Sequence, residues 1–291
     1  MLSLQTLFET GSHNTMTYTI ERNNDVGPDV SKVIRVIGRF LPILSKPIIY
    51  NWSVNQIINV KEQLNNGIRY LDLRVAKKSV DDKIYFLHGL FGAEVNQPLK
   101  EIADWLSTHP QETLILDFQH FYKFSEADHL GLIDQVKYVF RGKMCPASSK
   151  LDHLTLEWMK LERYQVIVVY RNIVAQNFSN LWPSGLWPTP WPDTVNKDRL
   201  VNFLTDGLRS RSRSTGYVSQ CVLTPDVPYV IKHIFGTLQR NLCVVCSKVT
   251  LPWIENNSPG NGGLNIVISD EVSYNNYVFP KTVIQRNVAL L

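Results

Sequence analysis

The stretch Gly67-Ile-Arg-Tyr-Leu-Asp-Leu-Arg-Val75 alternates from residue to residue and predicts a β-strand. One face of that strand ends in Asp72 and Arg74, whereas the opposite face carries the apolar side chains of Leu71 and Leu73. Two charged side chains at the end of one face need a polar destination, because a charge buried without a partner is costly. The strand therefore indicates a sheet with a polar site at one edge.

Further short apolar runs predict more strands, and stretches with helical spacing lie between them. This alternation, without an internal repeat, favours an α/β fold of the irregular or incomplete (β/α) barrel type. A doubly wound open sheet is the alternative, but no glycine-rich phosphate loop follows an early strand. The further strands are predicted at residues 84–87, 113–118, 165–170, 218–223 and 265–269. The helices are predicted at residues 54–65 (capped by Ser53), 99–108, 125–140, 154–162, 197–213 and 228–242.

The composition is that of one packed domain, and we expect residues 1–291 to form a single barrel. The chain is 44% hydrophobic and 19% charged with a net charge of +4, which does not indicate disorder or a nucleic-acid partner. It contains no apolar run of about 18 residues that could span a membrane, and its first residues lack the signal-peptide pattern. Its four cysteines, among them Cys243 and Cys246, predict reduced, buried thiols. These features predict a cytoplasmic protein.

Two histidines stand beside glycines at predicted strand ends, His13 near the start of the chain and His88 after the strand at 84–87. Barrel enzymes carry their chemistry at strand ends. If the first three strands are neighbours, Asp72 and Arg74 join both histidines on one rim. One imidazole can then accept a proton from an attacking hydroxyl, the other can donate one to a leaving alkoxide, and the guanidinium can bind phosphate oxygens. The alternative for each histidine is a structural role in a loop.

Carboxylates accompany these groups. Asp270 follows the strand at 265–269, which would close the barrel beside the first strand, and it can hold His13 in the required tautomer. Asp72 can either pair with Arg74 or orient His88. We therefore count Asp72 and Asp270 with the predicted catalytic residues.

A second tier of residues follows later strands. Asp117 and Gln119 share one face of the strand at 113–118 and its continuation, and Arg171 lies just beyond the strand at 165–170. We predict that they contact the substrate. Residues 182–192 hold three tryptophans and four prolines and predict a loop. This loop is expected to be a rigid plug over one barrel end or an aromatic edge that contacts membrane.

Five stretches resemble, in order and spacing, the phosphatidylinositol-specific phospholipase C X-domain-containing proteins. The resemblance covers nearly the whole chain, and five motifs in register are a far stronger signal than any one of them. The stretches are Gly11-Ser-His-Asn-Thr-Met-Thr-Tyr18, Gly67-Ile-Arg-Tyr-Leu-Asp-Leu-Arg74, Phe86-Leu-His-Gly-Leu-Phe91, Leu114-Ile-Leu-Asp-Phe-Gln-His-Phe-Tyr122 and Asn265-Ile-Val-Ile-Ser-Asp270.

This resemblance implies a distorted TIM barrel in which His13 acts as general base and His88 as general acid. The inositol 2-hydroxyl would attack the phosphorus, diacylglycerol would leave, and a cyclic inositol phosphate would form first. The implied partner is phosphatidylinositol at a membrane surface, contacted peripherally by a cytoplasmic monomer. Only residues 1–10 precede the first motif, so we expect a shortened first strand.

The family comparison bears on the metal in two opposite ways. Arg74 resembles the metal-independent bacterial enzymes, because its guanidinium supplies the positive charge that calcium would bring. Asn14, which we group with the substrate contacts, instead resembles the calcium-dependent enzymes, because the bacterial ones carry an aspartate after the first histidine. We expect no metal cofactor, with calcium as the alternative.

Two other functions stay open at this point. A glycerophosphodiester phosphodiesterase also uses two histidines at a barrel end, but it would need acidic metal ligands where Asn14 and Arg74 stand. A catalytically silent phosphoinositide-binding or scaffold protein would keep the barrel without turnover. The short start of the chain and Asn14 are the reasons to consider it.

Overall fold

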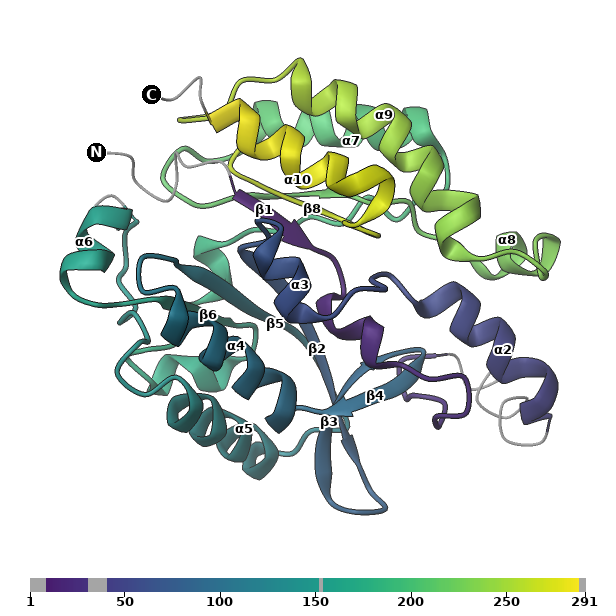
Figure 1. The fold of residues 1–291 in the computed structure, drawn as a ribbon, viewed down its shortest axis with the longest axis horizontal. Helices are drawn as coiled ribbons and strands as arrows, with labels where there is room; N and C mark the ends of the chain where they lie inside the picture. The colour runs from purple at the N-terminus through teal and green to yellow at the C-terminus, as the bar shows by residue number, and fades with distance from the viewer. Residues whose placement is uncertain (1–8, 31–40, 152–153, 288–291) are drawn as a thin grey trace.

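The computed structural model of the chain describes residues 9–30, 41–151 and 154–287, which build an α/β fold around a mixed sheet (Figure 1). The parallel strands follow the order β6-β5-β2-β1-β8-β7, and β3 and β4 add an antiparallel hairpin beside β2. The predicted α/β barrel class is confirmed, whereas the antiparallel hairpin was not predicted. The strands are β1 (Glu9–Ser12), β2 (Tyr70–Lys78), β3 (Lys83–His88), β4 (Leu90–Glu94), β5 (Leu114–Tyr122), β6 (Val166–Tyr170), β7 (Val218–Cys221) and β8 (Ile266–Ser269).

Strand β2 is the centre of the sheet. Along one side it pairs with β5, and along the other side it pairs first with β1, as far as Leu71, and then with β3, from Val75 onward. Gly11 in β1 permits the close approach to β2, because a Cβ there would lie 2.7 Å from the carbonyl oxygen of Tyr70. Of the predicted first strand at 1–10, only Glu9 and Thr10 belong to the described β1, and residues 1–8 lie outside the described part.

Residues 182–188 bridge the sheet between β6 and β7. The backbone N–H of Trp182 donates to the carbonyl of Val168 in β6 (2.7 Å), and Val218 in β7 donates to the carbonyl of Pro188 (2.9 Å). Both Trp182 and Trp187 are fully buried within the barrel interior. This part of the predicted loop therefore forms a wall of the barrel.

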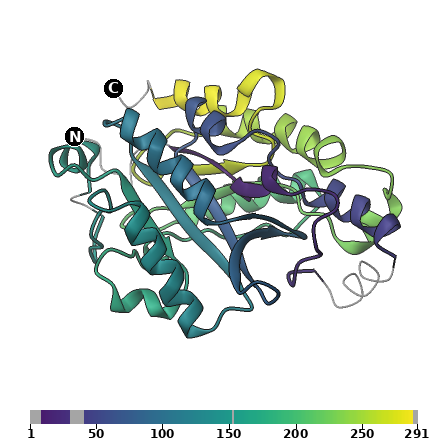
Figure 2. The same ribbon diagram turned by 60° about the horizontal axis from the view of Figure 1, so that its bottom comes forward.

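Helices cover the sheet from outside (Figures 1 and 2). Helices α4 and α5 lie on the β5 side, α7, α9 and α10 lie on the β7 and β8 side, and α2 and α8 lie together at one end. No helix in the described ranges is long and apolar enough to cross a membrane. The α-helices are α2 (Pro42–Ser53), α3 (Val60–Asn65), α4 (Asn96–Thr108), α5 (Glu126–Val139), α6 (Leu156–Leu161), α7 (Lys197–Ser210), α8 (Val227–Lys232), α9 (Val244–Glu255) and α10 (Tyr274–Arg286). Shorter helical turns are η1 (Thr15–Thr19), η2 (Ile173–Asn177), η3 (Ser184–Leu186) and η4 (Gln239–Cys243).

The predicted helix at 54–65 is wrong in its first half. Ser53 ends α2 instead of capping a new helix, and α3 begins only at Val60, where the Asn59 side chain accepts the N–H of Glu62 (2.8 Å). The intervening backbone is held in place from outside, because Thr17 Oγ1 accepts the N–H groups of the two residues after Val54 (3.0 and 2.9 Å). Hydrogen bonds to a distant turn thus replace those of a helix.

The predicted helix at 228–242 is also interrupted. Helix α8 ends at Lys232, the chain turns through Gly236, and a new helical segment starts where Thr237 Oγ1 accepts the N–H of Arg240 (3.1 Å). It continues as α9 and carries Cys243 and Cys246, which are buried and form no disulfide, as predicted for that pair. The break separates α8 from the packed helices and leaves it beside α2.

Candidate active site

Two strands meet end to end along β2 and bring both histidines to one place. Strand β1 runs along β2 as far as Leu71 and is followed by His13, whereas β3 runs the opposite way from Lys78 to Val75 and ends in His88. The interval of β2 that lies between them carries Arg74. The predicted convergence is thus reached through an antiparallel strand, and not through three parallel strand ends.

His13 is held by partners on both ring nitrogens. Its Nδ1 lies 2.7 Å from Asp270 Oδ1, and its Nε2 lies 2.9 Å from Arg74 Nη2 and 3.8 Å from Asp72 Oδ2. Because the carboxylate can only accept, we assign the Nδ1 proton to this contact. The lone pair of neutral His13 then lies on Nε2, which is the arrangement that a general base needs.

The segment between α2 and α3 supplies two residues that the sequence analysis missed. Asn55 Nδ2 donates to Asp270 Oδ1 (2.8 Å), and Gln56 Nε2 donates to the carbonyls of His13 (3.0 Å) and Ser269 (2.9 Å). They hold together the ends of β1 and β8. The cap pattern Asn59-Val-Lys-Glu62 was the available signal that the helix starts later and leaves this segment free.

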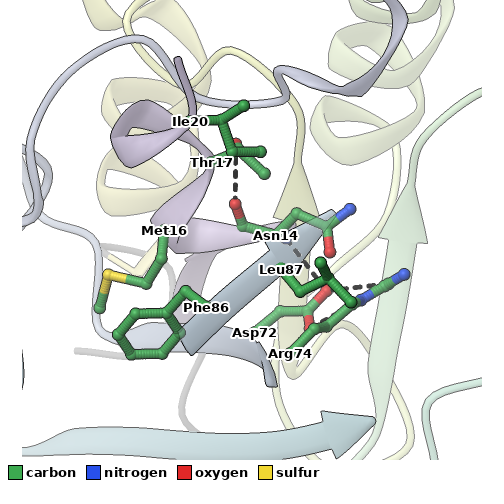
Figure 3. A pocket seen from close by; sticks show the side chains of 8 residues that line it. All are labelled: Asn14, Met16, Thr17, Ile20, Asp72, Arg74, Phe86 and Leu87. Atoms are coloured by element: carbon green, nitrogen blue, oxygen red, sulfur yellow. Dashed lines mark hydrogen bonds and ion pairs between the residues drawn. The ribbon is translucent and has the colours of Figure 1, made fainter. Parts of the chain in front are cut away.

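Asp72 and Arg74 form an ion pair next to His13. The guanidinium Nε and Nη2 lie 3.3 and 3.2 Å from the two oxygens of Asp72, and the N–H of Asn14 donates to Asp72 Oδ2 (3.1 Å). Burial raises the pKa of Asp72, but Arg74 and His13 outweigh it, so the pKa lies below its usual value. Figure 3 shows these contacts beside the apolar side chains of Met16 and Phe86.

His88 faces the same space with a different set of neighbours. Its Nδ1 lies 2.8 Å from the carbonyl of Ser53, at the end of α2, so we assign a proton to Nδ1. Burial lowers the pKa of His88, the positive charge of Arg74 lowers it further, and the carboxylate of Asp29 raises it. Asp29 Oδ2 accepts the N–H of Gly89 (2.7 Å), and its buried Oδ1 has no partner. No sequence signal pointed to Asp29, because only the folded chain brings it beside this histidine.

A cavity of about 640 Å³ joins these groups. Four of the five predicted catalytic residues line it, and the fifth, Asp72, lies just beneath with Asn14, lining the small void beside the cavity. The lining four are His13, Arg74, His88 and Asp270.

The remaining predicted substrate contacts form a separate network. Arg171 Nε and Nη2 donate to the two oxygens of Asp117 (2.8 and 2.6 Å), and Tyr70 donates to the same carboxylate (2.5 Å). Gln119 Nε2 reaches the hydroxyl of Tyr70 (3.2 Å). Arg171 lines a second cavity, of about 790 Å³, against α7. The structure therefore does not bring these residues into the cavity that the two histidines line.

The residues near His13 offer a metal ion few ligands. Across residues 9–30, 41–151 and 154–287, no three His, Cys, Asp or Glu side chains gather as a metal would require. Asn14 Oδ1 is buried without a partner, but the adjacent Asp72 carboxylate already pairs with Arg74. Calcium takes six to eight oxygen ligands, so this donor set, with a guanidinium in its midst, fits it poorly.

Known structures share this fold. The phosphatidylinositol-specific phospholipase C from Listeria monocytogenes superposes with a TM-score of 0.64 at 16% identity, covering 98% of this chain and 94% of that chain. A structure of the Staphylococcus aureus phosphatidylinositol-specific phospholipase C superposes with a TM-score of 0.69 at 14% identity, covering 98% and 93%. The chain therefore has the fold of these two proteins.

Sequence comparison then gives the family. The family model described as PI-PLC X matches residues 50–170. PI-PLC X domain-containing protein 2 of Mus musculus is 37% identical over 280 residues, which cover 95% of this chain and 81% of that protein. PI-PLC X domain-containing protein 3 of Homo sapiens is 33% identical, covering 95% and 86%. The chain belongs to the family of PI-PLC X domain-containing proteins, and the predicted resemblance is confirmed.

Proposed function

We propose that this protein is a phosphoric diester hydrolase that cleaves phosphatidylinositol to diacylglycerol and an inositol phosphate. The observation that carries the proposal is the position of His13 and His88 on one cavity, on either side of Arg74. The known structures that share the fold are named as phosphatidylinositol-specific, which supports this class of substrate.

The geometry supports different roles for the two histidines, with His13 as the general base and His88 as the general acid. His13 Nε2 takes the proton of the inositol 2-hydroxyl, whose oxygen attacks phosphorus and forms a cyclic phosphodiester. The bond from phosphorus to the glycerol oxygen breaks, and protonated His88 donates its Nε2 proton to that oxygen, which leaves as diacylglycerol. Asp270 stabilises the imidazolium formed on His13, and Asn55 orients Asp270. In the hydrolysis of the cyclic ester, neutral His88 takes a proton from a water whose oxygen attacks phosphorus. The bond from phosphorus to the inositol 2-oxygen breaks, and protonated His13 returns its proton to that oxygen.

We further propose that the reaction needs no metal ion. Arg74 carries a fixed positive charge next to His13 Nε2, where the phosphoryl oxygens of the substrate would lie. A divalent cation at that point would be repelled by the guanidinium and would compete for Asp72. Arg74 thus takes the part that an ion plays in calcium-dependent catalysis.

Apolar side chains around the cavity mouth support action at a lipid surface. Trp191, Val227 and Ile231 line the cavity and are exposed, and Phe235 just beyond α8 is 94% exposed. Exposed large apolar side chains clustered at one place mark a contact surface for protein or membrane. The substrate is a membrane lipid, so we propose peripheral contact with a membrane, made by a cytoplasmic protein whose four cysteines are all free.

The test is release of water-soluble inositol phosphate from phosphatidylinositol vesicles, with chelator and with added calcium. We expect chelator-resistant turnover that falls by roughly 10²-fold or more in His13→Ala and in His88→Ala, the usual contribution of a general base or acid. His109→Ala is the matched control, because His109 stacks on Trp105 outside the cavity. Turnover that requires calcium would overturn metal independence. A folded parent that binds vesicles without turnover would replace the enzyme with a binding protein.

A further inference from the structure

The cavity extends beyond its polar floor into an apolar cleft between α2 and α8. Its walls are Ile48, Ile49 and Trp52 from α2, facing Leu223, Val230 and Leu238 from the chain after β7. Both views of the fold draw α2 and α8 next to each other (Figures 1 and 2), and the rings of Trp52 and Tyr229 are in contact with centroids 5.8 Å apart. The break in the chain after Lys232 keeps α8 in this position.

One end of the cavity is polar and the other is apolar. His13, Arg74 and His88 supply the groups that bind an anion, whereas the walls of the cleft between α2 and α8 are mainly apolar. The whole space, about 640 Å³, lies within the range of roughly 300–1,000 Å³ that is usual for small-molecule sites. A ligand that fills it is therefore amphiphilic, with its anionic group at the histidines and an uncharged chain in the cleft.

Asp226 and Trp52 line the cleft and carry polar side-chain groups. Asp226 lines the cavity, but its carboxylate caps α8 by accepting the N–H of Tyr229 (2.8 Å). Trp52 Nε1 is buried and has no hydrogen-bond partner. Because it is buried, this N–H does not present a polar atom to the cleft.

We propose that the cleft between α2 and α8 binds an acyl chain of the lipid substrate, so that the protein holds the hydrocarbon while the phosphodiester lies between His13 and His88. The identity of the lipid rests on the proposed function, but the cleft can be tested without turnover. This site is distinct from the exposed Phe235, which does not line the cavity and would contact a membrane without enclosing any chain.

The probes are hexyl, octyl and decyl phosphate, used as monomers below their micelle concentrations, with inorganic phosphate as the reference without a chain. We expect the affinity measured by titration calorimetry to rise about fourfold for each methylene that enters the cleft. Ile234→Asp at the cleft should remove most of this dependence. Val245→Asp on α9 is the control, because the two side chains are exposed to nearly the same degree, 37% and 38%.

Equal affinities for the three alkyl phosphates in the parent protein would overturn the proposal. An Ile234→Asp variant that loses vesicle binding but keeps the chain-length dependence would also overturn it, because Ile234 would then contact only the membrane surface. Chain-length dependence in a protein that never cleaves phosphatidylinositol would support the cleft and reject the proposed function. The two failures are therefore distinguishable.

Discussion

Two aspartate–arginine pairs lie side by side in the barrel and differ in what surrounds them. Asp72 in β2 and Asp117 in β5 are direct neighbours in the sheet register, and each pairs with an arginine. The side chains of Arg74 and Arg171 are almost equally buried, with 16% and 15% of their surface exposed. The residue types, their register in the sheet and the exposure of the arginines therefore do not distinguish the two pairs.

Their partners do separate them. Arg171 makes two short hydrogen bonds to Asp117 and a third to the carbonyl of Trp187 (2.6 Å). Arg74 makes two longer contacts to Asp72 and extends Nη2 to His13. The closed pair, Asp117–Arg171, fixes the barrel wall formed by the tryptophan segment. The open pair, Asp72–Arg74, leaves its guanidinium at the cavity that both histidines line, where the proposed substrate would bind.

The largest effect is expected from breaking the closed pair. Arg171→Met leaves the buried Asp117 without its cation and should lower the free energy of unfolding by about 3–5 kcal/mol, measured in urea at pH 7. The double variant Arg171→Met/Asp117→Asn should recover much of that loss, because no charge is then left unpaired. A fully stable Arg171→Met variant that no longer cleaves phosphatidylinositol would instead assign Arg171 to the substrate, as the sequence analysis predicted.

The two pairs also mark how far sequence could reach. His13, Arg74 and Asp270 were predicted together because each lies at or near the end of a strand whose order in the sheet follows from the pattern. Asn55 and Asp29 were not predicted, because long-range hydrogen bonds, from the backbone N–H of Asn55 and to the carboxylate of Asp29, place them and no local periodicity does. The closed character of the Asp117–Arg171 pair was hidden for the same reason: its third partner is the carbonyl of a residue 16 positions away.

Substitution of Arg74 in the open pair should lower the activity strongly and the free energy of unfolding only slightly. Arg74→Lys keeps the positive charge beside Asp72 but loses the planar fork that can serve Asp72, His13 and a phosphate at once. We expect kcat to fall roughly 10²-fold, as for loss of one donor to a developing charge, with the free energy of unfolding changed by less than about 1 kcal/mol. A variant that unfolds as readily as Arg171→Met would show that both pairs are structural.

The smallest effect concerns the charges around His88, which differ in sign. Arg74 from β2 and His13 after β1 oppose its protonation, and Asp29 and the carbonyl of Ser53 favour it. Burial lowers the pKa of His88 below its ordinary value of about 6.5, so a His88 that acts as an acid is protonated only on the acidic side. The rate should therefore fall as pH rises through this lowered pKa. Because the folded state disfavours protonated His88, the contribution of this residue to the free energy of unfolding is fully present above about pH 6.5. It is lost as pH falls through the pKa of His88 in the folded protein.

Asp29→Asn tests this balance, because it removes a negative charge while keeping an acceptor for the N–H of Gly89. Without that charge the pKa of His88 falls further, so the alkaline limb of the kcat/KM profile should move to lower pH. At pH values below both limbs, the variant should regain the rate of the parent, which a merely structural defect would not allow. His88→Ala should lack this limb altogether. An Asp29→Asn profile in which kcat/KM is lowered equally at every pH would show that Asp29 only supports the backbone at Gly89. The pKa of His88 would then be set by groups other than Asp29.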